Sequence, residues 1–210
     1  MGGVGRVDPT EFFEVEARRC GYARVAGLDE AGRGPLAGPV VAAAVILPRR
    51  CALVGLNDSK QVPETERERL YEEISRRAVA LAVGVVGVPE IDRLNILEAT
   101  RLAMRRAVRA LRPAPDYLLI DAAGLPDLLI PQRAIIKGDG LSVSIAAASI
   151  LAKVTRDRLM REYHRQFPLY RFDIHKGYGT PEHLRLLAQH GPCAIHRRSF
   201  RPVREVLQYG

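Results

Sequence analysis

The amino-acid sequence predicts an α/β protein, in which helices flank a mixed five-stranded sheet and a small helical segment follows at the C-terminus. Apolar residues make up 47% of the 210 residues, enough for the core of one ordinary domain. After a first pair of strand patterns, short apolar runs alternate with helical patterns. We expect three parts: an N-terminal extension over residues 1–20, the sheet domain over 21–167, and a helical segment over 168–210 docked on it.

The N-terminal elements are a short helix and a pair of strands. The segment DPTEFFEVEARRC, residues 8–20, offers Asp8 as an N-cap and Pro9 in the first turn of a helix. Residues 23–29 and 39–47 are apolar runs joined through a Gly-Arg-Gly turn, so they predict two strands.

The middle of the chain predicts two helices around a strand. VPETERERLYEEISRRA is charged and amphipathic, which indicates a helix over about residues 63–78. The apolar run LAVGVVGV predicts a strand over 81–88. Apolar residues at helical spacing then predict a second helix over about 92–111.

Two further strands and two helices complete the pattern. DYLLID (116–121) and RAIIKGD (133–139) predict short strands that each end in an acid. The alanine-rich stretch from residue 142 to about 166 predicts a long helix that can pack closely on a sheet. PEHLRLLAQHG (181–191) predicts a last helix with a glycine stop.

Charge and cysteine content narrow the class of protein. A net charge of +8 and a pI of about 9.8 favour an anionic partner, nucleic acid before anionic lipid. The three cysteines lack CxxC spacing, which argues against a disulfide framework or a cysteine-based zinc site. The N-terminus has no signal-peptide core, and no apolar run approaches about 18 residues. We therefore expect a cytoplasmic monomer without a membrane partner.

Acids stand at the ends of three predicted strands: Asp29 with Glu30, Asp121, and Asp139. Strand ends are where sites gather in an open sheet, so four carboxylates would converge on one region. Such a cluster repels itself unless it binds a hard divalent cation such as Mg²⁺ or Mn²⁺. Because neighbouring strand residues face opposite sides, Asp29 and Glu30 can share a site only if the strand ends or bulges there.

The turn formed by Gly32, Arg33 and Gly34 supplies that break in the prediction. Glycines there would let backbone N–H groups approach a phosphate or a sugar closely. A plain turn remains the alternative, since the segment has neither P-loop nor dinucleotide-binding spacing. The histidines lack zinc spacing; His175 and His196, each followed by a basic residue, fit phosphate contacts or a solvated tail equally well.

Six segments, taken together and in order, resemble the bacterial ribonuclease HII family over about residues 22–203. They are GLDEAGRGPLAGPVVAAAVIL, LNDSKQV, IDAAGLP, IIKGDGLSVSIAAASILAKVTRDRLM, HKGYGTPEH and HRRSF. The resemblance implies an RNase H-like fold and a metal-dependent endoribonuclease using Mg²⁺ or Mn²⁺. It also implies two substrates: RNA–DNA hybrids, and duplex DNA with single embedded ribonucleotides, cut on their 5′ side to begin ribonucleotide excision.

The resemblance also implies roles for particular residues. The catalytic acids of the family match Asp29, Glu30, Asp121 and Asp139. The turn of Gly32, Arg33 and Gly34 matches the segment whose backbone reads the 2′-hydroxyl, and Tyr178 matches the aromatic that stacks on the sugar. Lys60 is similar to a phosphate-contacting residue. Asp157 competes for the place of the fourth acid, but it falls inside the predicted helix, so we favour Asp139.

Two-metal chemistry suits phosphodiester hydrolysis. Two cations about 3.5–4 Å apart can activate a water, align it, and stabilise the departing oxygen. We hypothesise that Asp29 bridges the ions, that Glu30 and Asp121 hold one, and that Asp139 holds the other. The 2′-hydroxyl that marks a ribonucleotide both donates and accepts hydrogen bonds, which suits recognition by backbone groups.

Two other functions compete with this one. A junction or strand-transfer nuclease could use the same fold, but it would not need the paired Gly-Arg-Gly turn and Tyr178. A non-catalytic nucleic-acid-binding module would have no use for four clustered acids, which repel phosphate.

Overall fold

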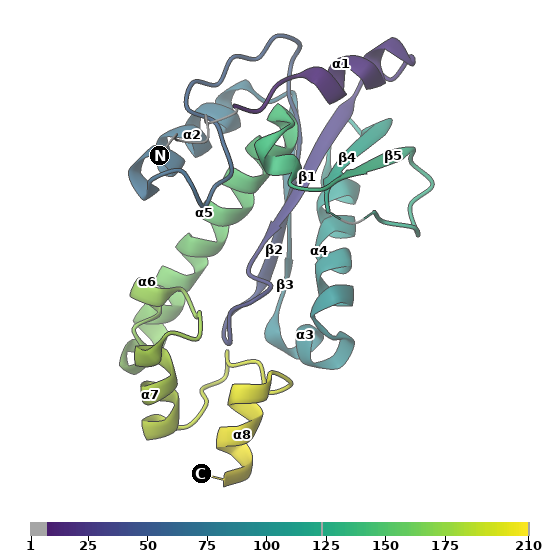
Figure 1. The fold of residues 1–210 in the computed structure, drawn as a ribbon. Coiled ribbons are helices and arrows are strands. Elements are labelled where there is room, and N and C mark those ends of the chain that lie inside the picture. Colours follow the sequence, from purple (N-terminus) through teal and green to yellow (C-terminus); the bar gives the residue numbers. More distant parts are fainter. Residues whose placement is uncertain (1–7, 123, 210) are drawn as a thin grey trace, which may run out of the picture.

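The computed structural model describes residues 8–122 and 124–209. Within them, five strands form one mixed sheet in the order β3-β2-β1-β4-β5 (Figure 1). Strand β1 pairs antiparallel with β2 and parallel with β4; β3 pairs antiparallel with β2, and β5 pairs parallel with β4. The strands are β1 (Val25–Ala31), β2 (Val40–Ile46), β3 (Ala80–Val86), β4 (Tyr117–Asp121) and β5 (Gln132–Ile135). The predicted fold class is confirmed.

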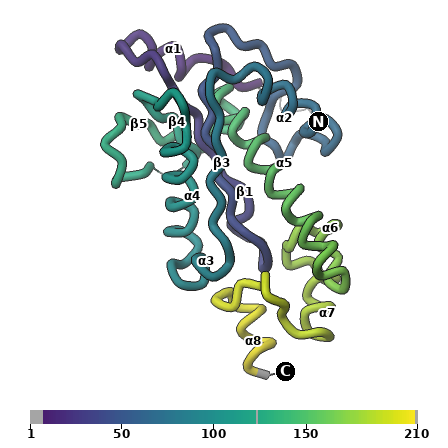
Figure 2. Tube along the Cα trace, turned by 180° about the vertical axis from the view of Figure 1, so that it is seen from behind, coloured from purple at the N-terminus to yellow at the C-terminus, as the bar shows by residue number. Residues whose placement is uncertain are grey.

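Helices cover both faces of this sheet, as the two views from opposite sides show (Figures 1 and 2). One face packs against the long helix α5 (Val143–Gln166). On the same side, α2 (Glu64–Arg77) packs against α5 and shares its apolar cluster. The other packs against α4 (Ile96–Ala110), which follows the short α3 (Val88–Leu94). All seven residues of β2 are consequently buried, which explains its continuous apolar sequence.

Gly27 in β1 sets the close approach of α5 to the sheet. A Cβ at this position would lie 2.1 Å from the backbone carbonyl carbon of Ser144. Only glycine lets α5 lie this near the strand that carries Asp29 and Glu30. The alanine-rich start of α5 serves the same packing, because Ala146, Ala147 and Ala148 are fully buried.

The C-terminal helices lie beyond the end of α5, and α1 (Phe12–Arg19) lies at the opposite end of the sheet (Figure 1). They are α6 (Phe172–His175), α7 (Pro181–His190) and α8 (Arg201–Tyr209). An isolated bridge between Ala37 and His196 joins this segment to the turn after β1. The division at residues 20 and 167 stays a prediction, and residues 1–7 lie outside the described part of the chain.

Two strand boundaries differ from the prediction. Strand β1 continues in register to Ala31, so Asp29 and Glu30 lie within it instead of at its end. Strand β5 ends at Ile135, and Asp139 lies in a 3₁₀ turn over Gly138–Gly140. The chain leaves the sheet there because Lys137 adopts a left-handed conformation, with φ of 56°.

The expected helix over 92–111 is two helices. Asn95 separates them with φ of 72°, and its side-chain oxygen accepts hydrogen bonds from the backbone of Leu97 and Glu98. It therefore ends α3 and caps α4. Across the described residues, no helix has both the length and the apolar character needed to cross a membrane.

Candidate active site

The candidate site lies where β4 stops pairing with β1. The last paired residues are Leu28 and Ile120, so Asp29 lies beside Asp121 and the edge of β1 is open beyond them. Asp29 points to the α5 side, where Ser149 is close enough to lower its pKa. Glu30 points to the α4 side and lines a small pocket together with Asp121. Asp29 and Glu30 therefore share one region because the edge of β1 is unpaired there, and not because the strand ends or bulges.

Burial and mutual repulsion dominate the electrostatics of the adjacent acids. Asp29 is only 5% exposed. Burial raises its pKa well above the usual range, and the charges of Glu30 and Asp121 raise it further. Burial also raises the pKa of Glu30, although Arg33 partly opposes this with a hydrogen bond of 3.2 Å from Nη1 to Oε1.

Asp139 joins this region from its 3₁₀ turn. Burial, followed by the negative charges of Asp58 and Asp121, raises its pKa to about 6. The turn itself is tied to β4, because the backbone N–H of Gly138 donates to Oδ1 of Asp121 at 2.7 Å. The structure therefore brings together all four acids that the sequence singled out. It also adds Asp58, which sequence reasoning did not name as a site residue. Its position in the LNDSKQV segment, next to Lys60, could have indicated it.

Asp157, the competing fourth acid, pairs with cations instead of with the other acids. It sits in α5, where Lys153 bonds it at 2.8 Å and Arg67 approaches within 3.7 Å. Its charge is therefore balanced by two cations, whereas it is not among the charges that raise the pKa values of Asp29 and Asp139. This arrangement favours Asp139 as the fourth acid.

The four acids suit a hard cation by their chemistry. In the described part of the chain, no three His, Cys, Asp or Glu side chains stand close enough to form a finished metal cluster. Asp29 and Asp139 nevertheless bury carboxylates next to other carboxylates. Carboxylate oxygens are the donors that Mg²⁺ and Mn²⁺ prefer, and a divalent ion would relieve this repulsion. The donor set fits such ions.

A cavity of about 190 Å³ adjoins the acids and contains the other predicted residues. Gly32, with φ of +95°, lets the chain turn sharply, and a Cβ there would lie 2.1 Å from Nε of Arg156. Across the cavity, Cε1 of Tyr178 lies 4.0 Å from where a Cβ of Gly34 would be. The lining residues are Glu30, Ala31, Gly32, Arg33, Gly34, Ser59, Lys60, Ser149, Lys153 and Tyr178.

Lys60 lies at the rim of this cavity with its side chain 78% exposed. Burial would lower its pKa, but the carboxylates of Asp58, Asp139, Asp29 and Asp121 together raise it. The ammonium group thus stays charged beside the acids and remains accessible to a ligand. Sequence reasoning missed three of its neighbours in the cavity: Ser59, Ser149 and Lys153.

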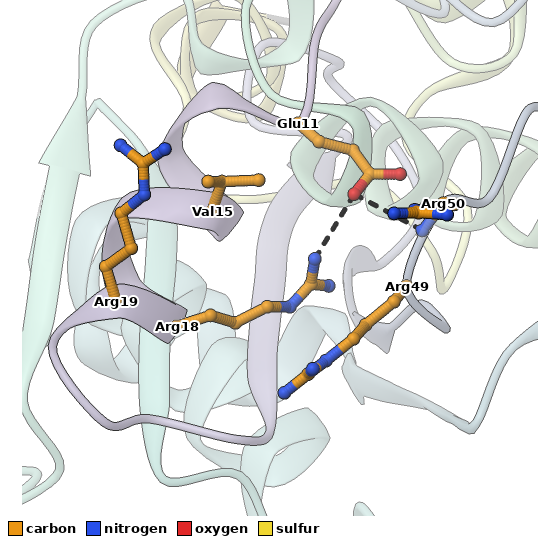
Figure 3. Close-up of a pocket in the computed structure, with 6 residues that line it drawn as sticks. All are labelled: Glu11, Val15, Arg18, Arg19, Arg49 and Arg50. Atoms are coloured by element: carbon orange, nitrogen blue, oxygen red, sulfur yellow. Dashed lines mark hydrogen bonds and ion pairs between the residues drawn. The ribbon is translucent and has the colours of Figure 1, made fainter.

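A second cavity, of about 330 Å³, lies at the other end of β1 (Figure 3). Four arginines of α1 and of the segment after β2 line it together with Glu11, which accepts from Nη1 of Arg18 at 3.2 Å. This cavity contains none of the predicted site residues. Its lining residues are Glu11, Val15, Arg18, Arg19, Arg49 and Arg50.

The predicted exposure of the histidines in the C-terminal segment was wrong. His175, His183 and His196 are buried, so they are neither solvated nor placed to contact phosphate. Arg197, which follows His196, is fully buried as well. Their partners are backbone groups, such as the carbonyls of Tyr170 and Tyr178, and in the case of His183 and His196 also each other's rings. Local sequence patterns do not reveal such contacts.

The fold belongs to the class of RNase H-type nucleases. The crystal structure of ribonuclease H2 from Pyrococcus horikoshii OT3 superposes with a TM-score of 0.75 and 28% identity, covering 89% of this chain and 98% of that one. Bst-RNase HIII in complex with Mn²⁺ shares the fold, with a TM-score of 0.72 and 23% identity, over 88% of this chain and 69% of that one.

Sequence comparison identifies the family. The model of the family "Ribonuclease HII" matches residues 26–203. The ribonuclease HII of Desulfitobacterium hafniense is 59% identical over 187 residues, which are 89% of this chain and 72% of the relative. The chain therefore belongs to the ribonuclease HII family and is a nuclease of the ribonuclease H type. A non-catalytic binding module and a junction nuclease are excluded.

Proposed function

We propose that the protein hydrolyses the RNA strand of RNA–DNA hybrids and also cuts on the 5′ side of single ribonucleotides embedded in duplex DNA. The cut would leave 5′-phosphate and 3′-hydroxyl ends and would begin ribonucleotide excision. One observation carries this proposal: Glu30, one of the clustered acids, also lines the cavity between the Gly32–Gly34 turn and Tyr178. The catalytic acids and the residues that contact the sugar would then act on neighbouring atoms of one nucleotide.

Asp29, Glu30, Asp121 and Asp139 would hold two Mg²⁺ or Mn²⁺ ions. The ions, when bound, would supply an activated water and stabilisation of the departing 3′-oxygen. The positions of these acids are fixed by the sheet. Strands β1 and β4 carry three of them, and the hydrogen bond from Gly138 to Asp121 ties the turn that carries Asp139 to β4.

The cavity residues would bind the substrate. Tyr178, with 43% of its surface exposed, would stack on the sugar opposite the turn. Backbone groups of Gly32, Arg33 and Gly34 would contact the 2′-hydroxyl, which DNA lacks. Lys60 would contact a phosphate, since its accessible ammonium group carries a full charge.

Replacing Asp121 by asparagine tests the catalytic part of the proposal. Asp121→Asn keeps the size of the side chain but removes the charge, so cleavage of a hybrid with Mg²⁺ or Mn²⁺ should fall by roughly 100-fold or more. Asp127→Asn is the matched control, because Asp127 is 68% exposed and pairs with Arg105 away from the site. Metal-dependent cleavage that survives intact in Asp121→Asn would contradict the proposed site.

A further inference from the structure

Two arginines are buried beneath the turn that lines the cavity. Arg156 is 1% exposed and Arg197 is 0% exposed. Among the described residues, neither forms an ion pair with a carboxylate, although buried charges ordinarily have one. Burial lowers the pKa of Arg156 to about 10 and that of Arg197 to about 9, so both stay charged at neutral pH.

Backbone carbonyls take the place of the missing acids. Arg197 donates from Nη2 to Gly32 O at 2.6 Å, from Nη1 to Arg33 O at 2.9 Å, and from Nε to Gly38 O at 3.0 Å. A planar fork with fixed donors suits three such acceptors, whereas a lysine could not reach them together.

Arg156 binds the other side of the same loop. It donates to Pro39 O and Ala37 O, each at 3.1 Å, and to Lys176 O at 3.0 Å. Lys176 lies two residues before Tyr178, whose ring centre is 5.9 Å from the guanidinium carbon. The two arginines therefore join the Gly32–Pro39 loop to the segment that carries Tyr178.

The contacts of Arg197 also fix where the N–H groups of the turn point. In a trans peptide the C=O and N–H bonds point in opposite directions, and the peptides of this turn are trans. Because Arg197 binds the carbonyls of Gly32 and Arg33, the N–H groups of Arg33 and Gly34 point away from it. Neither N–H has a hydrogen-bond partner among the described residues, and both belong to residues that line the cavity.

We propose that Arg197 is a positioning residue for ribonucleotide recognition, which orients the N–H groups of Arg33 and Gly34 toward an oxygen of the ribose. Arg156 supports it by holding the loop against the Tyr178 segment. The inference rests on the proposed function, because it assigns the cavity to the sugar of a ribonucleotide. It predicts that the fork of Arg197, and not only its charge, determines how well the protein distinguishes ribonucleotide from deoxyribonucleotide.

The test compares binding in an Asp121→Asn background, where cleavage does not interfere. Fluorescence anisotropy with Mg²⁺ measures the affinity for a duplex containing one ribonucleotide and for the all-DNA duplex of the same sequence. Arg197→Lys keeps the charge and loses the fork, so the preference for the ribonucleotide duplex should fall by about 10-fold or more, as a small misplacement of contact groups allows. Arg197→Met should in addition bind the all-DNA duplex more weakly at low salt.

Arg106→Lys is the matched control. Arg106 also donates to a backbone carbonyl, that of Val85, but it lies exposed on α4, where it pairs with Glu90. This variant should keep the preference of the parent protein. Circular dichroism and thermal unfolding establish that each variant is folded. A folded Arg197→Lys protein with an unchanged preference would overturn the inference.

Two further measurements keep the inference testable if the Arg197 variants do not fold. Arg156→Lys, which loosens the same loop from its other side, should lower the preference in the same direction. In the Asp121→Asn protein, the amide NMR signals of Arg33 and Gly34 should shift with the ribonucleotide duplex and not with the all-DNA duplex. Equal shifts with both duplexes would also overturn it.

The Asp121→Asn protein with an intact Arg197 shows whether a failure concerns the role of Arg197 or the proposed function. If Asp121→Asn binds both duplexes equally, the proposed ribonucleotide recognition fails. If it prefers the ribonucleotide duplex and Arg197→Lys does so to the same extent, only the role of Arg197 fails.

Discussion

Two buried histidines form a hydrogen-bonded chain that ends on the backbone of Tyr178. His183 Nδ1 lies 2.8 Å from the carbonyl oxygen of Tyr178, which can only accept, so Nδ1 carries a proton. His183 Nε2 then accepts from His196 Nε2 at 3.0 Å, and His196 Nδ1 accepts from the backbone N–H of Cys193 at 3.0 Å. Both rings are satisfied only when they are neutral.

This chain makes stability depend on pH. Burial lowers the pKa of His183 to about 4 and that of His196 to about 3, whereas an unfolded histidine has a pKa near 6.5. Between about pH 6.5 and 4 the unfolded chain takes up protons that the folded chain cannot, so stability should fall with decreasing pH by up to about 1.4 kcal/mol per pH unit for each histidine. Above that range these two groups contribute no pH dependence.

Urea unfolding at several pH values between 5 and 7.5 measures this dependence. His183→Gln should reduce the slope of the unfolding free energy against pH by up to about one proton. His190→Gln changes an exposed histidine of the same helix and serves as the control. An identical slope in wild type and His183→Gln would contradict the neutral buried chain.

At the scale of residues, the sequence predicted the acids better than their surroundings. Asp29, Glu30 and Asp121 follow apolar strand patterns directly, which makes them visible. Arg197 and the histidines looked like surface groups, because nothing local indicates that a charged residue will be buried among backbone carbonyls. Their burial depends on loops that are distant in the sequence and meet only in the folded chain.

At the scale of elements, α1 is fastened to the start of α5 by a buried carboxylate. Glu14 is 1% exposed; it accepts from Oγ of Ser142 at 2.6 Å and from the backbone N–H of Ser144 at 3.0 Å, and also from Oγ of Ser144. A negative charge at a helix N-terminus is favourable. Helix α1 thus contributes to the position of α5, although it lies outside the part matched by the family.

Removing this carboxylate should destabilise the protein. Glu14→Ala leaves buried donors of Ser142 and Ser144 without an acceptor, so the unfolding free energy should fall by about 2–4 kcal/mol. Glu16→Ala removes another carboxylate of α1, one that is 42% exposed and pairs with Arg133 of β5. This change should lower the unfolding free energy by less than about 1 kcal/mol. Urea unfolding of both variants measures the difference, and equal effects would show that the Glu14 contacts do not stabilise the fold.

The element boundaries show where periodicity reaches its limit. The strand predicted over 133–139 continued to the acid because the apolar pattern did not reveal the left-handed Lys137 that ends it. The helix predicted over 92–111 is interrupted at Asn95, because an asparagine can stand inside a helical pattern as well as at a helix cap. Backbone conformations of this kind depend on contacts such as Gly138 to Asp121, which a local pattern does not contain.

At the scale of the whole molecule, two parts of the chain meet at the site. The sheet and the turn that follows β5 carry the acids, while the segment after α5 carries Tyr178 and Arg197. Alternating strand and helix patterns were sufficient to predict the sheet and its flanking helices. The docking of the C-terminal segment on the turn after β1 could not be located in the same way, because its contacts join residues that are distant in the sequence. The bridge between Ala37 and His196 and the hydrogen bonds from Arg197 to Gly32 and Arg33 are examples.

In the proposed mechanism, the acids promote cleavage at the nucleotide whose ribose is bound in the cavity. The most direct test is single-turnover cleavage of an end-labelled duplex with one embedded ribonucleotide, beside the all-DNA duplex of the same sequence. We predict one cut on the 5′ side of the ribonucleotide, a 3′-hydroxyl on the upstream fragment, no cut in the all-DNA duplex, and much slower cutting by Tyr178→Ala. Equal cutting of both duplexes, or cuts placed without regard to the ribonucleotide, would contradict the account.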